Sequence, residues 1–147
     1  MNVSISHLLE SKGRALHTVP SGVTVAEAVK AMNQHRIGAI LIMNGPRLAG
    51  IFTERDVLTR VVAAGLDPRT TPVAQVMTAG VLSVPPETTV QQVMDIFAEK
   101  RCRHLPVMDA GELVGLISIG DVSRWVANQH RAEAESLRSY IAGALTT

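Results

Sequence analysis

Apolar residues recur at three- and four-residue spacing after Thr24 and again after Thr89. Glu27 and Gln92 follow these two threonines by three positions, which gives each stretch the capping box that starts many α-helices. The pattern therefore predicts two amphipathic helices, one beginning directly after Thr24 and the other directly after Thr89.

Each predicted helix is followed by two short apolar runs around a turn signal. Residues 39–43 and 48–52 flank the turn sequence Asn44-Gly45. The same pattern recurs over residues 104–117, around Asp109-Ala110-Gly111. Runs of this length on either side of such a turn predict two β-hairpins.

A short strand and a second helix complete each set of elements. The apolar stretch that ends at Pro20 or Pro85 predicts a brief strand, because proline cannot continue a central ladder. A helical pattern then begins near Thr53 and near Ser118, directly after each hairpin. Both halves of the chain therefore read strand, helix, strand, strand, helix.

The two halves are copies of one unit. Residues 17–62 overlay residues 82–127 at a constant offset of 65 with no gap. We expect an α+β fold in which two pseudo-twofold-related β-α-β-β-α repeats pack through their sheets, because hairpins this small do not stand alone. The expected divisions are 1–66 for the first repeat, 67–127 for the second, and a C-terminal helix over 128–147.

Composition narrows the class of protein. The chain has 147 residues, 46% of them hydrophobic, which excludes a disordered or fibrous protein. Its net charge of +1 argues against a main task on nucleic acid or an anionic membrane. The longest apolar run, 37–43, is far short of the roughly 20 residues that cross a bilayer. A single cysteine, Cys102, and a start without signal-peptide features lead us to expect a cytoplasmic protein.

One repeated motif carries candidate chemistry. Gly50 to Asp56 and Gly115 to Asp121 both read glycine, two apolar residues, a hydroxyl residue, two variable residues and aspartate. A strand that ends in Thr or Ser and enters a helix places a hydroxyl beside unpaired backbone N–H groups, which suits a phosphate. The aspartate can accept hydrogen bonds from the vicinal hydroxyls of a ribose. The motif therefore suits a nucleotide.

The same residues also fit a simpler role. Ser or Thr followed three residues later by Asp is an ordinary capping box that needs no ligand. Thr24 and Thr89 show that this chain uses such boxes purely at helix starts. The glycine, the preceding strand and the twofold occurrence favour a ligand site, and a ligand-free scaffold stays open as the alternative.

Taken together, these features resemble a tandem pair of cystathionine beta-synthase (CBS) domains, also called a Bateman module. The resemblance covers residues 3–127 and rests on the double motif, the order of elements and the string 101–107, Arg-Cys-Arg-His-Leu-Pro-Val. It implies a cleft between the repeats with two related sites for an adenosine-containing ligand. AMP, ADP, ATP, NAD(H) and S-adenosylmethionine all remain open, and no metal is required.

The resemblance also implies roles for individual residues. The motif aspartates, Asp56 and Asp121, would hold ribose, and the motif hydroxyls, Thr53 and Ser118, would approach phosphate. The other implied ligand contacts lie at the start of the first strand and at the start of the hairpin of each repeat: Thr18, Val19, Gly38 and Ala39 in the first, and Ser83, Val84, Arg103, His104, Leu105 and Pro106 in the second.

The first repeat departs from the family pattern. It has Gly38-Ala39 where the second repeat has Arg103-His104, and so lacks both polar side chains. We expect the two half-sites to differ in charge and volume, with Arg55 as a replacement phosphate partner in the first.

We therefore expect a regulatory, non-catalytic protein that binds an adenine nucleotide and modulates an unidentified protein effector. An enzyme has little support, because no base, nucleophile, P-loop or metal-ligand spacing stands out. The apolar stripes around Val57 to Val62 and around Trp125 predict a homodimer that pairs through helices. Cys102 aligns with Ile37 and is expected to be a core residue rather than a redox group.

Overall fold

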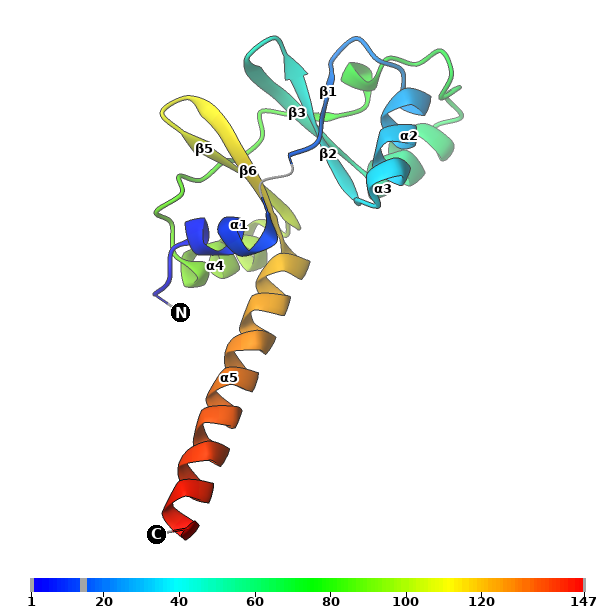
Figure 1. The fold of residues 1–147 in the computed structure, drawn as a ribbon. Coiled ribbons are helices and arrows are strands. Elements are labelled where there is room, and N and C mark those ends of the chain that lie inside the picture. Colours follow the sequence, from blue (N-terminus) through cyan, green and yellow to red (C-terminus); the bar gives the residue numbers. More distant parts are fainter. Residues whose placement is uncertain (1, 14–15, 147) are drawn as a thin grey trace. The chain divides into compact units, whose positions relative to one another are not determined.

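The computed structural model describes residues 2–13 and 16–146. It is an α+β chain in which the two helices after Thr24 and Thr89, both hairpins and the helices that follow them occur in the predicted order (Figure 1). The elements are α1 (Ile5–Lys12), β1 (Thr18–Pro20), α2 (Val25–His35), β2 (Ala39–Asn44), β3 (Arg47–Thr53), α3 (Glu54–Asp56), the π-helix η1 (Val57–Val62), the 3₁₀-helix η2 (Val73–Gln75), β4 (Thr78–Ala79), α4 (Val90–Lys100), β5 (His104–Asp109), β6 (Glu112–Ser118) and α5 (Ile119–Thr146).

The chain divides into two compact units. The hairpin unit comprises Arg14–Pro85 and Leu105–Leu116, and the terminal unit comprises Met1–Gly13, Pro86–His104 and Ile117–Thr147. The hairpin unit contains a four-stranded sheet in the order β1-β2-β3-β4. Its β1 runs parallel to β2, and β3 is antiparallel to both β2 and β4.

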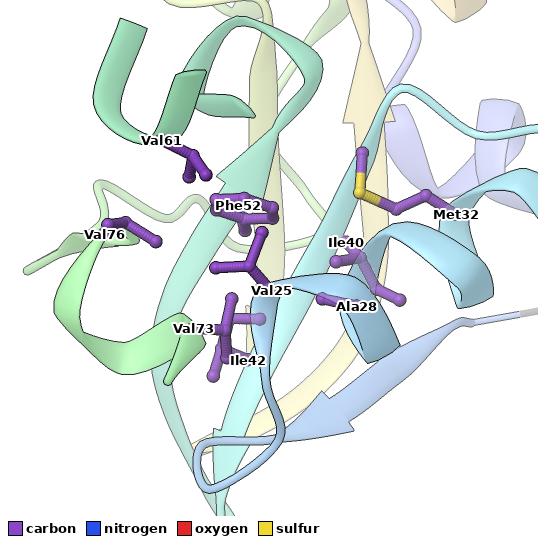
Figure 2. Close-up of a cluster of buried hydrophobic side chains, with 9 residues drawn as sticks. All are labelled: Val25, Ala28, Met32, Ile40, Ile42, Phe52, Val61, Val73 and Val76. Atoms are coloured by element: carbon purple, nitrogen blue, oxygen red, sulfur yellow. The ribbon is translucent and has the colours of Figure 1, made fainter. Parts of the chain in front are cut away.

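The main core of the hairpin unit lies between α2 and one face of this sheet. Phe52, Ile40 and Ile42 are completely buried on the sheet, and Val25 and Ala28 meet them from α2 (Figure 2). This packing follows from the sequence pattern, because the three-four spacing of α2 and the alternation of β2 direct apolar side chains to one interface.

A second cluster covers the opposite face of the sheet. Ala39, Leu41 and Ile51 are buried there, and Leu113 and Leu116 from the second hairpin pack against them. The predicted packing of the two repeats through their sheets is therefore confirmed within this unit.

The terminal unit joins α1, α4 and α5, and α5 contacts both of the other helices. Ile5 and Leu8 of α1, and Val90 and Val93 of α4, are buried or nearly so. The rest of α5 extends beyond α1 and α4 (Figure 1). We expected a separate helix over 128–147, but α5 is one continuous helix from Ile119 that runs past Gly143.

The segments that lead into the repeats are exchanged. The N-terminal segment caps the second repeat's helix, with the Val90 amide donating to the Val3 carbonyl at 2.9 Å. The segment before the second repeat does the same for the first, since the Val25 amide donates to the Thr71 carbonyl at 2.9 Å. Each repeat is thus completed by chain that precedes the other one.

Some elements differ from their predicted form. Val84 makes only an isolated parallel bridge with Val107, so the strand predicted before Pro85 is reduced to a single pair. The helix after Thr53 begins as a short α-helix and continues as the π-helix η1. There the Ala63 amide donates to the Leu58 carbonyl, five residues back.

Candidate functional site

The first motif forms a closed capping box at the end of β3. The Asp56 amide donates to Thr53 Oγ1 at 3.2 Å, and the Thr53 amide donates to Asp56 Oδ2 at 2.9 Å. Only 8% of Asp56 is exposed. The β-to-helix transition therefore fixes both the hydroxyl and the carboxylate in place.

The second motif repeats this geometry at the end of β6. The Asp121 amide donates to Ser118 Oγ at 3.1 Å, and the Ser118 amide donates to Asp121 Oδ2 at 2.9 Å. Asp121 is also 8% exposed. The two copies agree to about 0.1 Å, which means that the repeat preserves local geometry and not only residue type.

A backbone hydrogen bond joins each motif to the start of its hairpin. The Glu54 amide donates to the Gly38 carbonyl at 3.0 Å, and the Ile119 amide donates to the Arg103 carbonyl at 3.0 Å. The structure therefore brings the backbone of Gly38 beside the first motif and the backbone of Arg103 beside the second.

Cations surround the second aspartate. Lys12 Nζ lies 2.8 Å from Asp121 Oδ2, and Arg124 Nη2 lies 2.6 Å from Asp121 Oδ1. Burial raises the pKa of Asp121, but the hydrogen bonds from Lys12 and Ser118 and the Lys12 charge outweigh it and lower the pKa below its ordinary value. The carboxylate is thus held ionised.

The first aspartate has a different neighbour. Arg60 Nε lies 3.5 Å from Asp56 Oδ1, and Arg60 Nη1 donates to the carbonyls of Val76 and Met77 at 3.2 and 3.0 Å. Arg60 therefore ties the carboxylate to the segment that enters β4. The contact between Arg60 and Asp56, at 3.5 Å, is longer than the contacts of 2.8 and 2.6 Å that Lys12 and Arg124 make with Asp121.

An acidic side chain lies at the first motif. A Cβ atom on Gly38 would come within 2.7 Å of Glu54 Oε1, so the carboxylate of Glu54 passes directly over this glycine. The corresponding residues of the second repeat are Ile119 and Arg103. The first motif is therefore the more acidic and the second the more basic of the two.

The remaining predicted contacts of the first repeat lie in the hairpin unit with their motif. Thr18 is exposed and Val19 half-buried at the start of β1, while Ala39 is buried and pairs with Thr53. Arg55 is exposed on the first turn after Thr53. Because its side chain is buried, Ala39 can offer a ligand only its backbone atoms.

The predicted contacts of the second repeat fall in both units. Arg103, His104, Ser118 and Asp121 belong to the terminal unit. Ser83, Val84, Leu105 and Pro106 belong to the hairpin unit, where Ser83 is exposed and the other three are buried.

Sequence reasoning missed Lys12, Glu54, Arg60 and the reason for Gly50. A Cβ on Gly50 would lie 2.6 Å from the Thr78 carbonyl oxygen and 2.6 Å from Met77 Sδ, so this glycine lets β4 pair with β3. The four-residue spacing of Asp56 and Arg60 was a readable signal. Nothing in the sequence placed Lys12 next to a residue 109 positions away.

Other candidate chemistry is weaker. Cys102 is half-buried, and burial raises the pKa of its thiol, which makes the thiolate scarcer. Over residues 2–13 and 16–146, no group of three His, Cys, Asp or Glu side chains is arranged to hold a metal ion. In the same part of the chain, no helix combines the length and apolar character that crossing a membrane requires.

Comparison with known proteins identifies the family. The CBS domain profile matches residues 13–63 and 73–128. The chain is 36% identical over 151 residues to the mitochondrial CBS domain-containing protein CBSX3 of Arabidopsis thaliana, covering 97% of this chain and 73% of that protein.

Solved structures agree with this assignment. The solved structure of a signal-transduction protein with CBS domains from Burkholderia ambifaria MC40-6 is 39% identical, covers 84% of this chain and 93% of its own, and superposes with a TM-score of 0.81. A hexameric CBS-CP12 protein from bloom-forming cyanobacteria is 28% identical, covers 95% of this chain and 87% of its own, and has a TM-score of 0.74. This chain belongs to the CBS domain family and carries two CBS domains in tandem.

Proposed function

We propose that this chain is a regulatory sensor of an adenine nucleotide, without catalytic activity of its own. The observation that carries the proposal is the pair of motifs, in which a buried aspartate and a hydroxyl are fixed at a strand-to-helix junction in both repeats. Two such junctions give two places where the same chemical fragment can be recognised.

The capping bonds leave capacity for a ligand. Thr53 Oγ1 and Ser118 Oγ each accept one amide, and a hydroxyl retains its own hydrogen to donate to a phosphate oxygen. A carboxylate offers about four lone-pair positions, so Asp56 can accept the Thr53 amide and still accept a ribose hydroxyl. Capping and nucleotide binding are therefore compatible at one motif.

The charged residues around the two motifs favour different parts of a ligand. Lys12, Arg103 and Arg124 make the second motif suited to phosphate, and Lys12 must yield part of the Asp121 carboxylate if ribose is to bind it. At the first motif, Glu54 disfavours an anion over Gly38, and the small Gly38 leaves room for a bulkier neutral group. We infer unequal affinities at the two sites.

The sensor works as a homodimer in this proposal. Leu58, Val62 and Leu66 are 65%, 66% and 40% exposed on the hairpin unit. Val62 and Leu66 line an apolar groove of about 460 Å³ between α2 and η1. A surface this apolar is typical of a protein–protein interface. The hexameric state named for the CBS-CP12 protein shows that one relative assembles.

The direct test is thermal unfolding of the full chain with AMP, ATP and NADH. A ligand at 100 times its dissociation constant should stabilise the protein by about 2.7 kcal/mol. Asp56→Asn keeps an oxygen for the Thr53 amide but loses the charge, so it should weaken binding about tenfold. Asp95→Asn, an exposed change on α4, is the matched control and should leave binding unchanged.

A ligand-free scaffold is the second candidate, because both capping boxes are complete without a ligand. It predicts that Asp56→Asn alters stability alone and that none of the three nucleotides shifts the unfolding temperature. That result would reject the sensor.

A further inference from the structure

The distal part of α5 is not covered by any other residue that the structure describes. Every residue from 127 to 143 is exposed, whereas Val122 at the start of the helix is buried against the terminal unit. Figure 1 shows this segment extending past α1 and α4. Because most helices in proteins are stabilised by packing of an apolar face, this uncovered segment is a candidate for pairing with a second helix.

The exposed segment carries a seam at heptad spacing. Ala127, Ala134 and Ile141 are seven residues apart, and His130 and Leu137 fall between them at the alternate three-four positions. Leu137 is 59% and Ile141 49% exposed. In heptad notation, the first set occupies positions a and the second occupies positions d, and the small alanines permit close approach of a second helix.

We propose that residues 127–143 of α5 pair in parallel with the same segment of a second copy of this chain. In a parallel pair, position g of one helix faces position e of the next heptad in its partner. Glu133 occupies g and Arg138 occupies the following e, so Glu133 meets Arg138 of the partner subunit twice across the twofold axis. Charge complementarity thus selects a second copy as the occupant.

The antiparallel arrangement is disfavoured by the same charges. There position e faces e, which brings Arg131 next to Arg138 of the partner subunit on both sides of the pair. Like charges at such positions repel. Within one helix, Glu133 Oε2 lies 3.9 Å from His130 Nδ1, three residues away.

This pairing does not depend on nucleotide binding, and it uses a surface different from the groove of the hairpin unit. The proposed contact involves the terminal unit, because the same helix α5 carries Asp121 in its first turn. A segment of two and a half heptads makes a weak contact, so the test traps it covalently.

Disulfide trapping in the full chain tests the pairing. In a Cys102→Ala background, Ala134→Cys places a thiol at position a, where two parallel helices approach within disulfide range. Ser136→Cys, at the outward position c, is the matched control. Under mild oxidation, Ala134→Cys should form a covalent dimer at least about tenfold faster than Ser136→Cys.

Charge reversal supplies the second arm. Glu133→Arg or Arg138→Glu alone should lower the yield of the Ala134→Cys dimer several-fold, and the double reversal should restore it. Far-ultraviolet circular dichroism checks that each variant keeps its helix content.

Three results would overturn the proposal. The first is no covalent dimer from Ala134→Cys, even if the mass in solution is doubled, because the copies would then meet elsewhere. The second is equal rates for the two cysteine positions. The third is trapping only when Ala134→Cys is mixed with Leu137→Cys, which identifies an antiparallel pair.

Discussion

The two motifs have the same backbone geometry and different charged neighbours. Both close a capping box with distances that agree to about 0.1 Å. Lys12 and Arg124 lie next to Asp121, whereas at the first motif the carboxylate of Glu54 lies over Gly38. The residues that the repeats share build the junction, whereas residues in which the repeats differ, such as Glu54 and Arg124, and Lys12 from the segment before the first repeat, decide which charge it presents.

Lys12 illustrates how the difference arises. It is the last residue of α1, which packs in the terminal unit because the leading segments of the two repeats are exchanged. The corresponding segment before the second repeat forms only the short η2 and supplies no comparable cation to Asp56 among the described ion pairs. Repeat exchange therefore makes the two sites chemically unequal.

The largest expected effect is on the glycine that begins the first motif. Gly50→Ala would drive a Cβ atom to 2.6 Å from the Thr78 carbonyl oxygen, and backbone of β4 cannot give way as a side chain can. We expect a loss of about 2 to 3 kcal/mol in the free energy of unfolding, measured by urea denaturation. Gly22→Ala, where nothing lies within 4 Å, is the control. Equal stability of both variants would contradict the close approach of β4.

Next in size is the unequal cost of removing the two aspartates. Asp56→Ala should cost about 1 kcal/mol, the usual value of a helix cap. Asp121→Ala should lower the free energy of unfolding by about 2 kcal/mol, because it also removes the partner of Lys12 and Arg124. The expected loss is no larger because the side chains of Lys12 and Arg124 are 36% and 71% exposed, so water screens both ion pairs. Both are measured by urea denaturation without ligand, and identical losses would show that the cations around Asp121 contribute nothing.

A gain is expected at the glycine inside the second motif. Gly120 lies in the first turn of α5, and an added Cβ would meet only Arg124 Nη1 at 3.4 Å and Ser118 Oγ at 3.6 Å. Gly120→Ala should therefore raise the free energy of unfolding by about 0.5 to 1 kcal/mol. The first motif already has Arg55 at this position. A loss of stability would mean that Gly120 is needed for the junction itself.

The smallest expected effect is in the dependence of stability on pH. The pKa of Asp121 is lowered in the folded protein, so its contribution is present above the ordinary value of about 4 and is lost as pH falls below it. Lys12→Met removes a main cause of the lowered pKa and should reduce this acid sensitivity. Lys100→Met, on the exposed end of α4, should not. An unchanged acid profile for Lys12→Met would separate Lys12 from the ionisation of Asp121.

Local features were predictable from the sequence. The boxes at Thr24 and Thr89 set the starts of α2 and α4, and the turn residues Asn44-Gly45 set the first hairpin. These signals act over a few residues, so they survive in any tertiary context.

Long-range features were not predictable. The β4 edge strand, the exchange of leading segments and the Lys12–Asp121 ion pair all join residues far apart in sequence. Their formation depends on packing of whole elements, which no local periodicity encodes. The π-helix η1 was missed for a related reason, because α- and π-helical spacing bury the same apolar residues over so short a segment.

The central claim is that two motifs of equal geometry bind an adenine nucleotide unequally. Calorimetric titration of ATP into the full chain tests it most directly, with Asp56→Asn, Asp121→Asn and Arg103→Ala as variants. We predict two binding events of different affinity in the unaltered protein. Asp56→Asn should weaken one of them, and Asp121→Asn and Arg103→Ala should weaken the other. No heat of binding, or two identical events weakened equally by all three variants, would contradict the account.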